Sequence, residues 1–526
     1  MKLDDMFRLA ARGKISRRDF VQLSVAGGLT LAAGEAMFAR AARAEPKKGG
    51  FFRCALGHGN TKDTLDPATW NNAFDGDIGQ GLIGNMLVQI NTKNGVEPDL
   101  AESFEQENGA KTWVFRLRKG VTFHNGKSLE AEDVIASYRH HMGPDSKSAA
   151  KSILAIVDDI KADGKDTVVF TLKSGSADFP YLTSDYHLPI LPSKDGKMQW
   201  EKAEGTGPFI LEAFEPGVRA KGRRNPNYHR DVWFDEVEML SILDVAARTN
   251  ALVTGEVQYI DRPDLKTLAM LKRNGNLEVD NITGFAHFVA PMITTMAPFD
   301  NADVRRALKW SIDRQALVDK ILLGYGKPGN DNPIAPSVKF ATNPAPVHTL
   351  DPDKAKFHLK KAGLSSLKVD LSVSDAAFAG AVDAGVLMQD MAAKCGIEIN
   401  VVREGDDSYW DTVWMKKPWC MSFWGGRPTA DWMFTTAYAP DAAWNETAWK
   451  NPRFDELLLA ARAETDEAKR APMYAEMQDL VHDDGGVAVL MFNDWVSVHS
   501  KKVAHGDLNS NYDHDGGHLY QRWWFA

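Results

Sequence analysis

Alternation of apolar and polar positions marks strands in the first half of the chain. Within 111–118, Trp113, Phe115 and Leu117 occupy every second position, and the residues between them are polar or basic apart from one valine. A period of two predicts a strand with one buried face. The turn signals that follow, Gly120 and an Asn-Gly pair, agree with a strand that ends there.

Two further runs in this half have strand character, and one segment has helical spacing. The apolar runs Phe51–Leu56 and Thr167–Leu172 predict strands. Between them, Ser128 is placed to cap a helix that runs to about Met142, where a Gly-Pro pair stops it.

Helical spacing dominates the second half of the chain. Segment 300–324 repeats apolar residues three or four positions apart and ends at Gly324, so we predict one helix there with Asn301 as its cap. Segments 351–362 and Pro452–Ala463 each start at an Asx-Pro pair, which predicts two more helices with proline in the first turn. Strands are predicted at Leu367–Val373 and 397–402, on either side of a helical segment at 377–394. This strand–helix–strand order is typical of an α/β fold.

The N-terminus has the pattern of an export signal. Arg17 and Arg18 precede a weakly apolar stretch at 21–39, and Ala42-Arg43-Ala44 has the small residues of a cleavage site. The glycines of the stretch make it too polar for a stable membrane span of about 20 residues. We therefore predict that residues 1–44 are a twin-arginine signal peptide and that the product is a soluble periplasmic protein.

Composition excludes several classes of protein. The 526 residues suggest about three domains. The net charge is −9, and it falls to −13 without residues 1–44, so a nucleic-acid partner is not expected. The 15 Trp and 25 Phe exclude a disordered chain. The three Cys lack C-x-x-C spacing, which excludes a disulfide-rich scaffold and leaves pairing of Cys395 with Cys420 open.

Several segments occur in the order in which one family has them. They are Leu65-Asp66-Pro67, the string W-V-F-R-L-R-K-G-V-T-F-H-N-G at 113–126 with Glu-Asp-Val at 132–134, Gly-Thr-Gly-Pro-Phe at 205–209, Arg-Asn-Pro-Asn-Tyr at 224–228 and Asp-Val-Arg-Arg-Ala-Leu at 303–308. The string at 113–134 is the most specific of them. In these segments the chain resembles the large periplasmic solute-binding proteins of ABC importers (family 5), which include dipeptide, oligopeptide, nickel and opine receptors.

The resemblance implies an α/β, two-lobed periplasmic binding protein fold of the type II kind, with an extra subdomain inserted in the first lobe. Mapped onto this chain, the base lobe comprises 45–80, 200–288 and 497–526, the inserted subdomain 81–199, and the ligand-closing lobe 289–496. The resemblance further implies a monomer without cofactor that captures a solute by closure of the lobes. It implies membrane permease and ATPase subunits of an ABC importer as partners, and the N-terminal segment adds the twin-arginine export machinery.

The segment 405–449 contains the main candidates for ligand contact. Seven of the 15 Trp fall in it, and its central strand ends in a Gly/Pro loop. In the family this strand and loop reach the ligand, so the resemblance implies a pocket role for Trp424 and Arg427. Packing in the core is the alternative for the tryptophans, which are well buried on average.

Arg427 departs from the pattern of the peptide receptors. Many of these have an Asp about three residues after the tryptophan, where it pairs with the free amino group of a peptide. Arginine repels an ammonium group but offers a planar fork to a carboxylate or phosphate. We therefore expect a peptide or peptide-like solute that is anionic or opine-like. Asp431 is placed to meet a positive group of the ligand or to pair with Arg427.

Weaker candidates lie before this loop and at the cleft floor. Tyr409 and Trp410 are placed to cover a ligand, Phe74 and Asp75 to line the floor, and His287 to face the hinge. For each of them, packing or solvation is an equal alternative.

Two other classes of function are weighed against a receptor. The sequence has no G-x-S-x-G, H-E-x-x-H or Walker-type motif, so we expect no enzyme and no catalytic residues. The pair His140-His141 and the later His514 and His518 give no compact ligand set, so we expect no metal site. A receptor for an oligosaccharide or metal chelate, and a twin-arginine-exported periplasmic enzyme, remain as alternatives.

Overall fold

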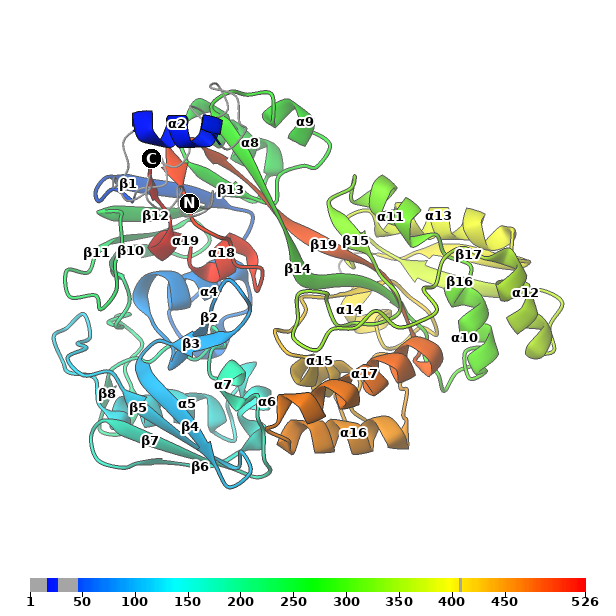
Figure 1. The fold of residues 1–526 in the computed structure, drawn as a ribbon, viewed down its shortest axis with the longest axis horizontal. Helices are drawn as coiled ribbons and strands as arrows, with labels where there is room; N and C mark the ends of the chain where they lie inside the picture. Colours follow the sequence, from blue (N-terminus) through cyan, green and yellow to red (C-terminus); the bar gives the residue numbers. More distant parts are fainter. Residues whose placement is uncertain (1–16, 27–45, 406–408) are drawn as a thin grey trace.

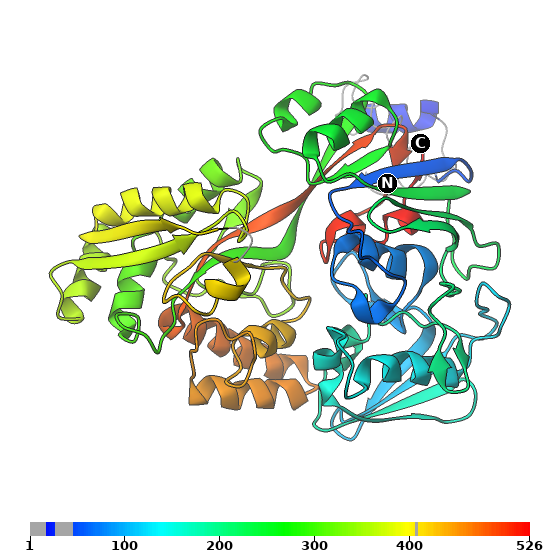
Figure 2. The ribbon, with the colours of Figure 1, turned by 180° about the vertical axis from the view of Figure 1, so that it is seen from behind.

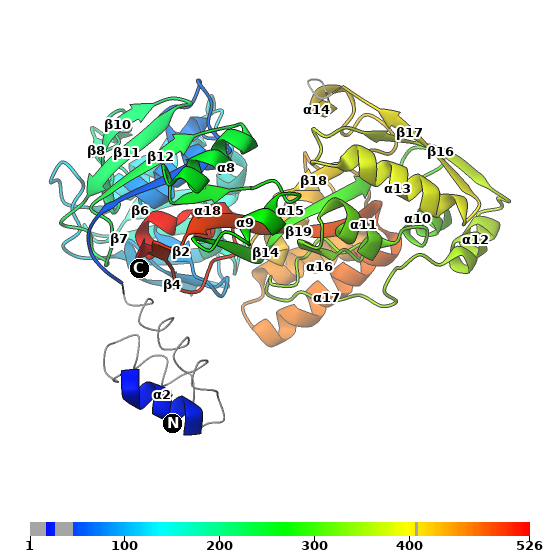
Figure 3. The same cartoon turned by 90° about the horizontal axis from the view of Figure 1, so that it is seen from above.

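Two long strands join two lobes. The computed structural model describes residues 17–26, 46–405 and 409–526. Strands β14 (Leu277–Pro291) and β19 (Val487–Ser500) pair antiparallel and run from one lobe into the other (Figure 1). Seen from above, the lobes lie side by side with these crossing strands between them (Figure 3). The predicted α/β, two-lobed fold is confirmed.

The predicted signal peptide is described only in part. Arg17–Ala26 forms helix α2. The rest of residues 1–44, with the predicted cleavage site, lies outside the described residues. No helix in the described part of the chain is long and apolar enough to cross a membrane.

A nine-stranded sheet collects segments that are far apart in the sequence. Its interior strand β1 (Phe51–Leu56) runs parallel to both of its neighbours, β12 (Glu236–Ser241) and β13 (Tyr259–Asp261), and β13 pairs with β19. The remaining members are β10 (Phe209–Glu215), β11 (Arg219–Arg224), β15 (Gly326–Pro328) and the edge strand β18 (Ser422–Trp424). The predicted strand Phe51–Leu56 is confirmed.

The base lobe packs helices and the C-terminal segment on this sheet. Phe52, Phe74, Phe234 and Tyr520 are buried together in its core. The elements around this core are η1 (Pro67–Thr69), α4 (Ala73–Asp77), the π-helix η2 (Ile78–Ile83), α8 (Val245–Thr254), α9 (Leu268–Leu271), β20 (Val503–Ala504), α18 (Asp513–Gly517), α19 (Leu519–Arg522) and β21 (Trp524–Phe525).

The C-terminal segment contains a left-handed turn. His514, Asp515, Gly516 and Gly517 have φ values of 57°, 59°, 69° and 78°. Two consecutive non-glycine residues in this region are rare, because the Cβ atom crowds the following carbonyl. A Cβ atom at Gly517 would lie 1.9 Å from the side-chain nitrogen of Gln80, so this position needs glycine. The turn brings the 513–517 backbone against η2 in the base lobe.

A four-stranded antiparallel sheet forms a separate subdomain beside the base lobe. Its order is β4–β5–β7–β6, and Phe115, Tyr138 and Phe170 fill its core. Its elements are β2 (Val88–Ile90), β3 (Val96–Pro98), β4 (Ala101–Glu107), β5 (Thr112–Leu117), α5 (Ala131–Met142), α6 (Ala150–Ile153), η3 (Leu154–Ile156), β6 (Val157–Ala162), β7 (Thr167–Leu172), α7 (Phe179–Leu182), β8 (Ser193–Lys194) and β9 (Lys197–Met198). The predicted strands at 111–118 and Thr167–Leu172 are confirmed.

The predicted cap of α5 is wrong. The N-cap is Glu130, and the backbone N–H of Glu130 donates a hydrogen bond of 3.0 Å to the side chain of Asp133. A carboxylate three residues into a helix satisfies an otherwise unpaired N–H donor and favours the helix dipole. Ser128 instead lies before the helix, in a bridge to Thr122.

The other lobe is mainly helical, with a parallel strand pair at its far end (Figure 2). β16 (Leu367–Val373) and β17 (Ile397–Arg403) flank α13 (Ala381–Ala393), as the strand–helix–strand pattern predicted. The helices are α10 (Ala302–Lys309), α11 (Arg314–Ile321), α12 (Pro352–Lys361), α14 (Tyr409–Thr412), α15 (Ala430–Ala437), α16 (Pro452–Ala463) and α17 (Glu467–Asp484).

The single helix predicted at 300–324 is wrong. The structure breaks it into α10 and α11, because Asp313 caps a second helix with a side-chain hydrogen bond of 2.9 Å from the N–H of Ala316. The predicted cap Asn301 is confirmed. Cys395 and Cys420 are both buried in this lobe as free thiols.

Candidate ligand-binding cleft

A cavity of about 680 Å³ lies where the lobes meet the crossing strands. The base lobe contributes Arg262, Leu265 and Asp513, and the crossing strands contribute Phe288 and Trp495. The helical lobe adds Phe378, Phe423 and Gly425. The cavity is within the usual size range of small-molecule sites, about 300–1,000 Å³, and its wall is largely aromatic and apolar.

Arg427 lies beside this cavity, in the loop after β18. It is two residues from Gly425, which lines the cavity, and its side chain is half-buried. Its Nη1 atom donates a hydrogen bond of 2.6 Å to the Gly426 carbonyl, and the guanidinium lies 5.8 Å from the Trp432 ring centre. No carboxylate in the described residues forms an ion pair with Arg427, so its charge is available to a ligand.

Groups of the opposite lobe lie within electrostatic reach of Arg427. Burial alone would raise the pKa of Asp185, but His187 and, more weakly, Arg427 hold that pKa below its ordinary value. The same positive charge acts on Tyr186 and Tyr512, whose pKa values burial raises. The two tyrosine rings are half-buried and 6.2 Å apart, edge to face. Arg427 is therefore near enough to this tyrosine pair for its charge to act on both hydroxyl groups across the lobe boundary.

Asp75 adds an unusual carboxyl group to this side. Its side chain is 2% exposed, and its Oδ1 atom has no hydrogen-bond partner among the described residues. Burial, and next the nearby Asp63, raise the pKa of Asp75 to about 7. The ring of Tyr186 packs against neighbouring Gly76, where an added Cβ atom would lie 3.3 Å from it. Near neutral pH Asp75 can therefore act as a donor or as an acceptor.

Trp424 lies directly before this loop but points into the core. It is 6% exposed, and its indole nitrogen donates a hydrogen bond of 2.7 Å to Glu446. Trp414 donates to the other oxygen of the same carboxylate at 2.6 Å, and burial raises the pKa of Glu446. The tryptophan-rich segment thus folds around the buried carboxylate of Glu446, which no motif marks in the sequence.

Asp431 pairs with Arg462 and not with Arg427, which excludes the second of the two partners considered for it. Its carboxylate accepts a hydrogen bond of 3.1 Å from Arg462 on α16. Burial raises the pKa of Asp431 to about 6 although Arg462 opposes this shift. Asp431 is the second residue of α15, and this position turns it away from the loop toward α16.

Three predicted contact residues are fully buried and offer no surface to a ligand in this conformation. Tyr409 donates to the Met421 carbonyl at 2.7 Å inside the helical lobe. Phe74 belongs to the base-lobe core, and His287 is 0% exposed with its Nδ1 atom donating to the Phe285 carbonyl. Apolar or hydrogen-bonded packing outweighs their positions near the cleft.

Trp410 is the exposed member of the predicted set. Its side chain is 38% exposed and meets Phe423, a cavity residue, with ring centres 5.7 Å apart. Trp410 therefore lies on the surface beside one of the residues that line the cavity.

The lobes also touch directly at the end of the cleft far from the crossing strands. Asp178 of the subdomain forms a two-bond ion pair of 2.7 and 2.9 Å with Arg470 of α17. The N–H of Ala177 donates to the Arg462 carbonyl at 2.9 Å, and Asn94 donates to the Ser337 carbonyl at 3.2 Å. Together with the crossing strands at the other end, these contacts bound the cleft at both ends.

The fold and cleft define a two-lobed binding protein that encloses a small solute. The sequence profile of "Bacterial extracellular solute-binding proteins, family 5 Middle" matches residues 95–446. The chain therefore belongs to this family of solute-binding proteins.

Relatives and solved structures agree with this assignment. "Di/tripeptide-binding protein 1" of Pseudomonas aeruginosa is 26% identical over 498 residues, which cover 85% of this chain and 91% of the relative. "Glutathione-binding protein GsiB" of Pectobacterium atrosepticum is 26% identical over 468 residues, covering 85% and 89%. The fold matches that of the periplasmic binding protein DppA from Helicobacter pylori in complex with the peptide STSA, with a TM-score of 0.75, 24% identity and coverage of 91% and 98%.

Sequence reasoning found the loop but missed its partners. The segments of Asp178, Tyr186 and Tyr512 contain no motif. Folding brings Asp178 to Arg470 and the two tyrosines near the charge of Arg427. The Asp-Tyr-His run at 185–187 was a possible signal, since it combines a carboxyl, an aromatic ring and an imidazole in a short loop.

Proposed function

We propose that this chain is the receptor of an ABC importer and that its solute is a peptide or peptide-like molecule with an anionic end. The observation that carries this proposal is the half-buried Arg427, which forms no ion pair with a carboxylate of the described residues. Peptide and glutathione receptors among the relatives support the peptide-like class. A structural neighbour in complex with agropinic acid supports an opine-like alternative within it.

We propose a role for each side of the cleft. Arg427 offers two parallel N–H donors to a carboxylate, which adds direction as well as charge. Tyr186 and Tyr512 supply ring surface and hydroxyl groups opposite it. Phe288, Phe378 and Phe423 give apolar area in the adjoining cavity. The solute's anionic end lies at Arg427 and its remaining atoms fill the cavity.

Lobe closure completes the binding cycle. We propose the base lobe as 45–80, 200–288 and 497–526, the inserted subdomain as 81–199 and the closing lobe as 289–496. Closure about β14 and β19 excludes water, which strengthens the Arg427 contact. The closed receptor then delivers its solute to permease and ATPase subunits, and it carries out no chemical step itself.

The N-terminal segment supports export of the folded protein by the twin-arginine route to the periplasm. A double substitution of Arg17 and Arg18 by Lys tests this part separately. The protein should then stay in the cytoplasmic fraction, whereas unchanged periplasmic recovery would assign another route.

A ligand panel tests the binding proposal. Purified protein without residues 1–44 is melted with glutathione, N-acetylated acidic dipeptides, neutral dipeptides, amino-acid conjugates, oligosaccharides and nickel–histidine complexes. Compounds with a free or terminal anion should raise the melting temperature, because a ligand at about 100 times its Kd adds about 2.7 kcal/mol to stability. Stabilisation by oligosaccharides or nickel complexes alone would reject the peptide-like class, and turnover of any compound would reject a receptor.

Two substitutions at one position then test the role of Arg427. R427A should weaken binding of the anionic compound by about 1.5–3 kcal/mol, the value of a charged hydrogen bond, or roughly 10- to 150-fold in Kd. R427D restores the acidic residue of peptide receptors and should shift preference toward neutral dipeptides with a free amine. Exposed Arg453 provides the control R453A, which should bind as the parent protein does. Equal affinity of R427A and R453A would remove Arg427 from the site.

A further inference from the structure

Two histidines and one carboxylate from three separate segments converge at the base-lobe end of the crossing strands. Asp280 lies on β14, His499 on β19, and His505 directly after β20. The Oδ2 atom of Asp280 lies 3.3 Å from the Nε2 atom of His499 and 3.3 Å from the Nε2 atom of His505. Ligand-type atoms of all three residues lie within 4.8 Å of one another.

Strand register and one tryptophan hold this arrangement. Asp280 is opposite Ser497 and His499 is opposite Glu278, so Asp280 and His499 are diagonal neighbours on adjacent strands. Trp523 contacts both imidazoles: its ring centre is 4.4 Å from that of His505, stacked, and 5.0 Å from that of His499, edge to face. The side chains are therefore oriented before any ligand arrives.

The hydrogen bonds of both imidazoles fix which nitrogen faces Asp280. His499 donates from Nδ1 to the Ser500 carbonyl at 3.0 Å, and His505 donates from Nδ1 to the Gly506 carbonyl at 2.7 Å. A neutral imidazole bonded in this way has its lone pair on Nε2, and metal-binding histidines are commonly oriented by such a bond. His499 is 2% exposed, and its Nε2 atom has no hydrogen-bond partner among the described residues. The Oδ2 atom of Asp280 likewise has none there.

The absence of a competing cation separates this cluster from two others. In both of the other His–carboxylate groups an arginine forms an ion pair with a carboxylate. In the group of Asp331, His348 and His482, Arg314 pairs with Asp331. In the group of His58, Asp261 and Asp513, Arg262 pairs with Asp513. Within the described chain, no Lys or Arg forms an ion pair with Asp280. An incoming cation therefore meets no fixed positive charge on this carboxylate.

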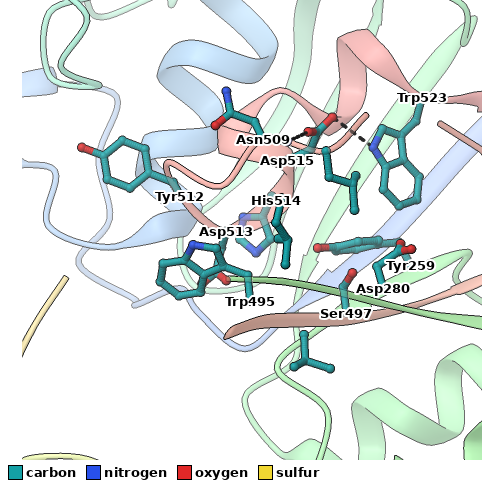
Figure 4. A pocket seen from close by; sticks show the side chains of 13 residues that line it. Tyr259, Asp280, Trp495, Ser497, Asn509, Tyr512, Asp513, His514, Asp515 and Trp523 are labelled. Carbon is teal, nitrogen blue, oxygen red and sulfur yellow. Dashed lines mark hydrogen bonds between the residues drawn. The ribbon is translucent and has the colours of Figure 1, made fainter. Parts of the chain in front are cut away.

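A small cavity adjoins the cluster. Asp280 lines it together with Tyr259, Ser497, Asp515 and Trp523, and Figure 4 shows these side chains around it. Its volume of about 20 Å³ is enough for one water molecule. Space for one further ligand atom is thus present beside the carboxylate.

We propose that Asp280, His499 and His505 bind a divalent transition-metal ion, for which zinc fits best. A tetrahedral zinc ion with bonds of about 2.0–2.1 Å sets neighbouring ligand atoms about 3.3 Å apart. The two Nε2–Oδ2 distances in the structure match this spacing. A water molecule supplies the fourth ligand. The ion clamps β14 and β19 to the C-terminal segment, apart from the solute cleft and independent of which solute is bound.

Metal titration of the untagged full chain tests this site. Protein stripped with EDTA is titrated with zinc chloride by calorimetry and, separately, with cobalt(II) in the visible spectrum. One zinc ion per chain should bind and raise the melting temperature, and cobalt should give the intense absorption of a four-coordinate site. H505Q and D280N should each lower zinc affinity at least tenfold, because each removes one of three protein ligands. H358Q provides a matched control, since His358 on α12 contacts one carboxylate, that of Asp303 on α10, at 2.8 Å.

The variants keep the test decisive. His505 and Asp280 retain 18% and 13% side-chain exposure, so both substitutions can be accommodated, and circular dichroism checks each fold before titration. Failure of the folded parent protein to bind zinc would overturn the proposal and leave an ion-paired His–Asp–His cluster. Zinc binding that is equal in the parent, H505Q and D280N would also overturn it, because the ion would then bind elsewhere.

Discussion

The ion pair between Asp178 and Arg470 should control how firmly the lobes close. In the structure it joins the subdomain to α17 by two charge-assisted hydrogen bonds of 2.7 and 2.9 Å. Arg470 is 4% exposed and also donates to the Ala461 carbonyl at 3.1 Å. Opening the lobes breaks both of these bonds, whereas the closed form keeps them. The pair therefore stabilises the closed form relative to the open form.

The size of this effect follows from removing one charge. D178N keeps the side-chain shape but removes the negative charge and one of the two acceptor oxygens. A hydrogen bond to a charged group contributes about 1.5–3 kcal/mol. The closed form should become less populated by roughly 10- to 150-fold relative to the open form. The solute that stabilises the parent protein in the panel should bind more weakly by up to the same factor, since binding requires closure.

Small-angle scattering and calorimetry measure this change. Ligand-free D178N should have a larger radius of gyration than the parent protein and a higher Kd for the solute. E476Q is the control, because it breaks an exposed ion pair of Glu476 with Arg453 within one lobe. The double variant D178R/R470D should recover part of the loss. Scattering and affinity of D178N identical to those of E476Q would refute the role of this ion pair.

Two further predictions concern the loop and the floor of the cleft. G426A should lower both the melting temperature and the solute affinity, because Gly426 has φ +79° and an added Cβ atom would lie 2.3 Å from Phe285. G425A is the control: among the described residues no atom lies within 4 Å of its added Cβ atom, so this variant should behave as the parent protein does. Equal melting temperatures of the two variants would contradict this reasoning. For Asp75, burial and then Asp63 raise the pKa from 3.8 to about 7, so the folded protein should lose stability as the pH rises from 4 to 7. One pKa unit corresponds to about 1.36 kcal/mol, so the free energy of unfolding of D75N, measured with urea, should exceed that of the parent protein by a few kcal/mol at pH 8 and by little at pH 4. A gain in stability confined to pH 4 would reject this account.

Local patterns predicted the regular elements better than their ends. Strands Phe51–Leu56, Thr167–Leu172 and Leu367–Val373 have the predicted bounds, because their apolar runs are flanked by turn residues. The break at Asp313 was missed, since the apolar spacing continues through it and only the cap hydrogen bond reveals the second helix.

The cleft was predictable only where a motif carried it. Arg427 follows from its position after the tryptophan, but its neighbours Tyr186 and Tyr512 come from remote segments. The cluster of Asp280 with His499 was missed for the same reason: the two residues are more than 200 positions apart and meet only through strand register. Residue spacing in one sequence holds no information on such contacts.

The order of strands in the nine-stranded sheet has a consequence for how the chain acquires its fold. β1 is among the first elements to be synthesised. Its partner β13 has β19 as its other neighbour in the sheet, with Tyr259 opposite His499, and β19 is synthesised late. At about 5–20 residues per second, a ribosome needs roughly 20–90 s to pass from β1 to the end of β19. During that time the first strand has no finished sheet to join, whereas β16, α13 and β17 have all their partners within one short stretch. The lobe that emerges first is thus the last to be completed, and loss of β19 would leave the edge of β13 without its partner and open to aggregation.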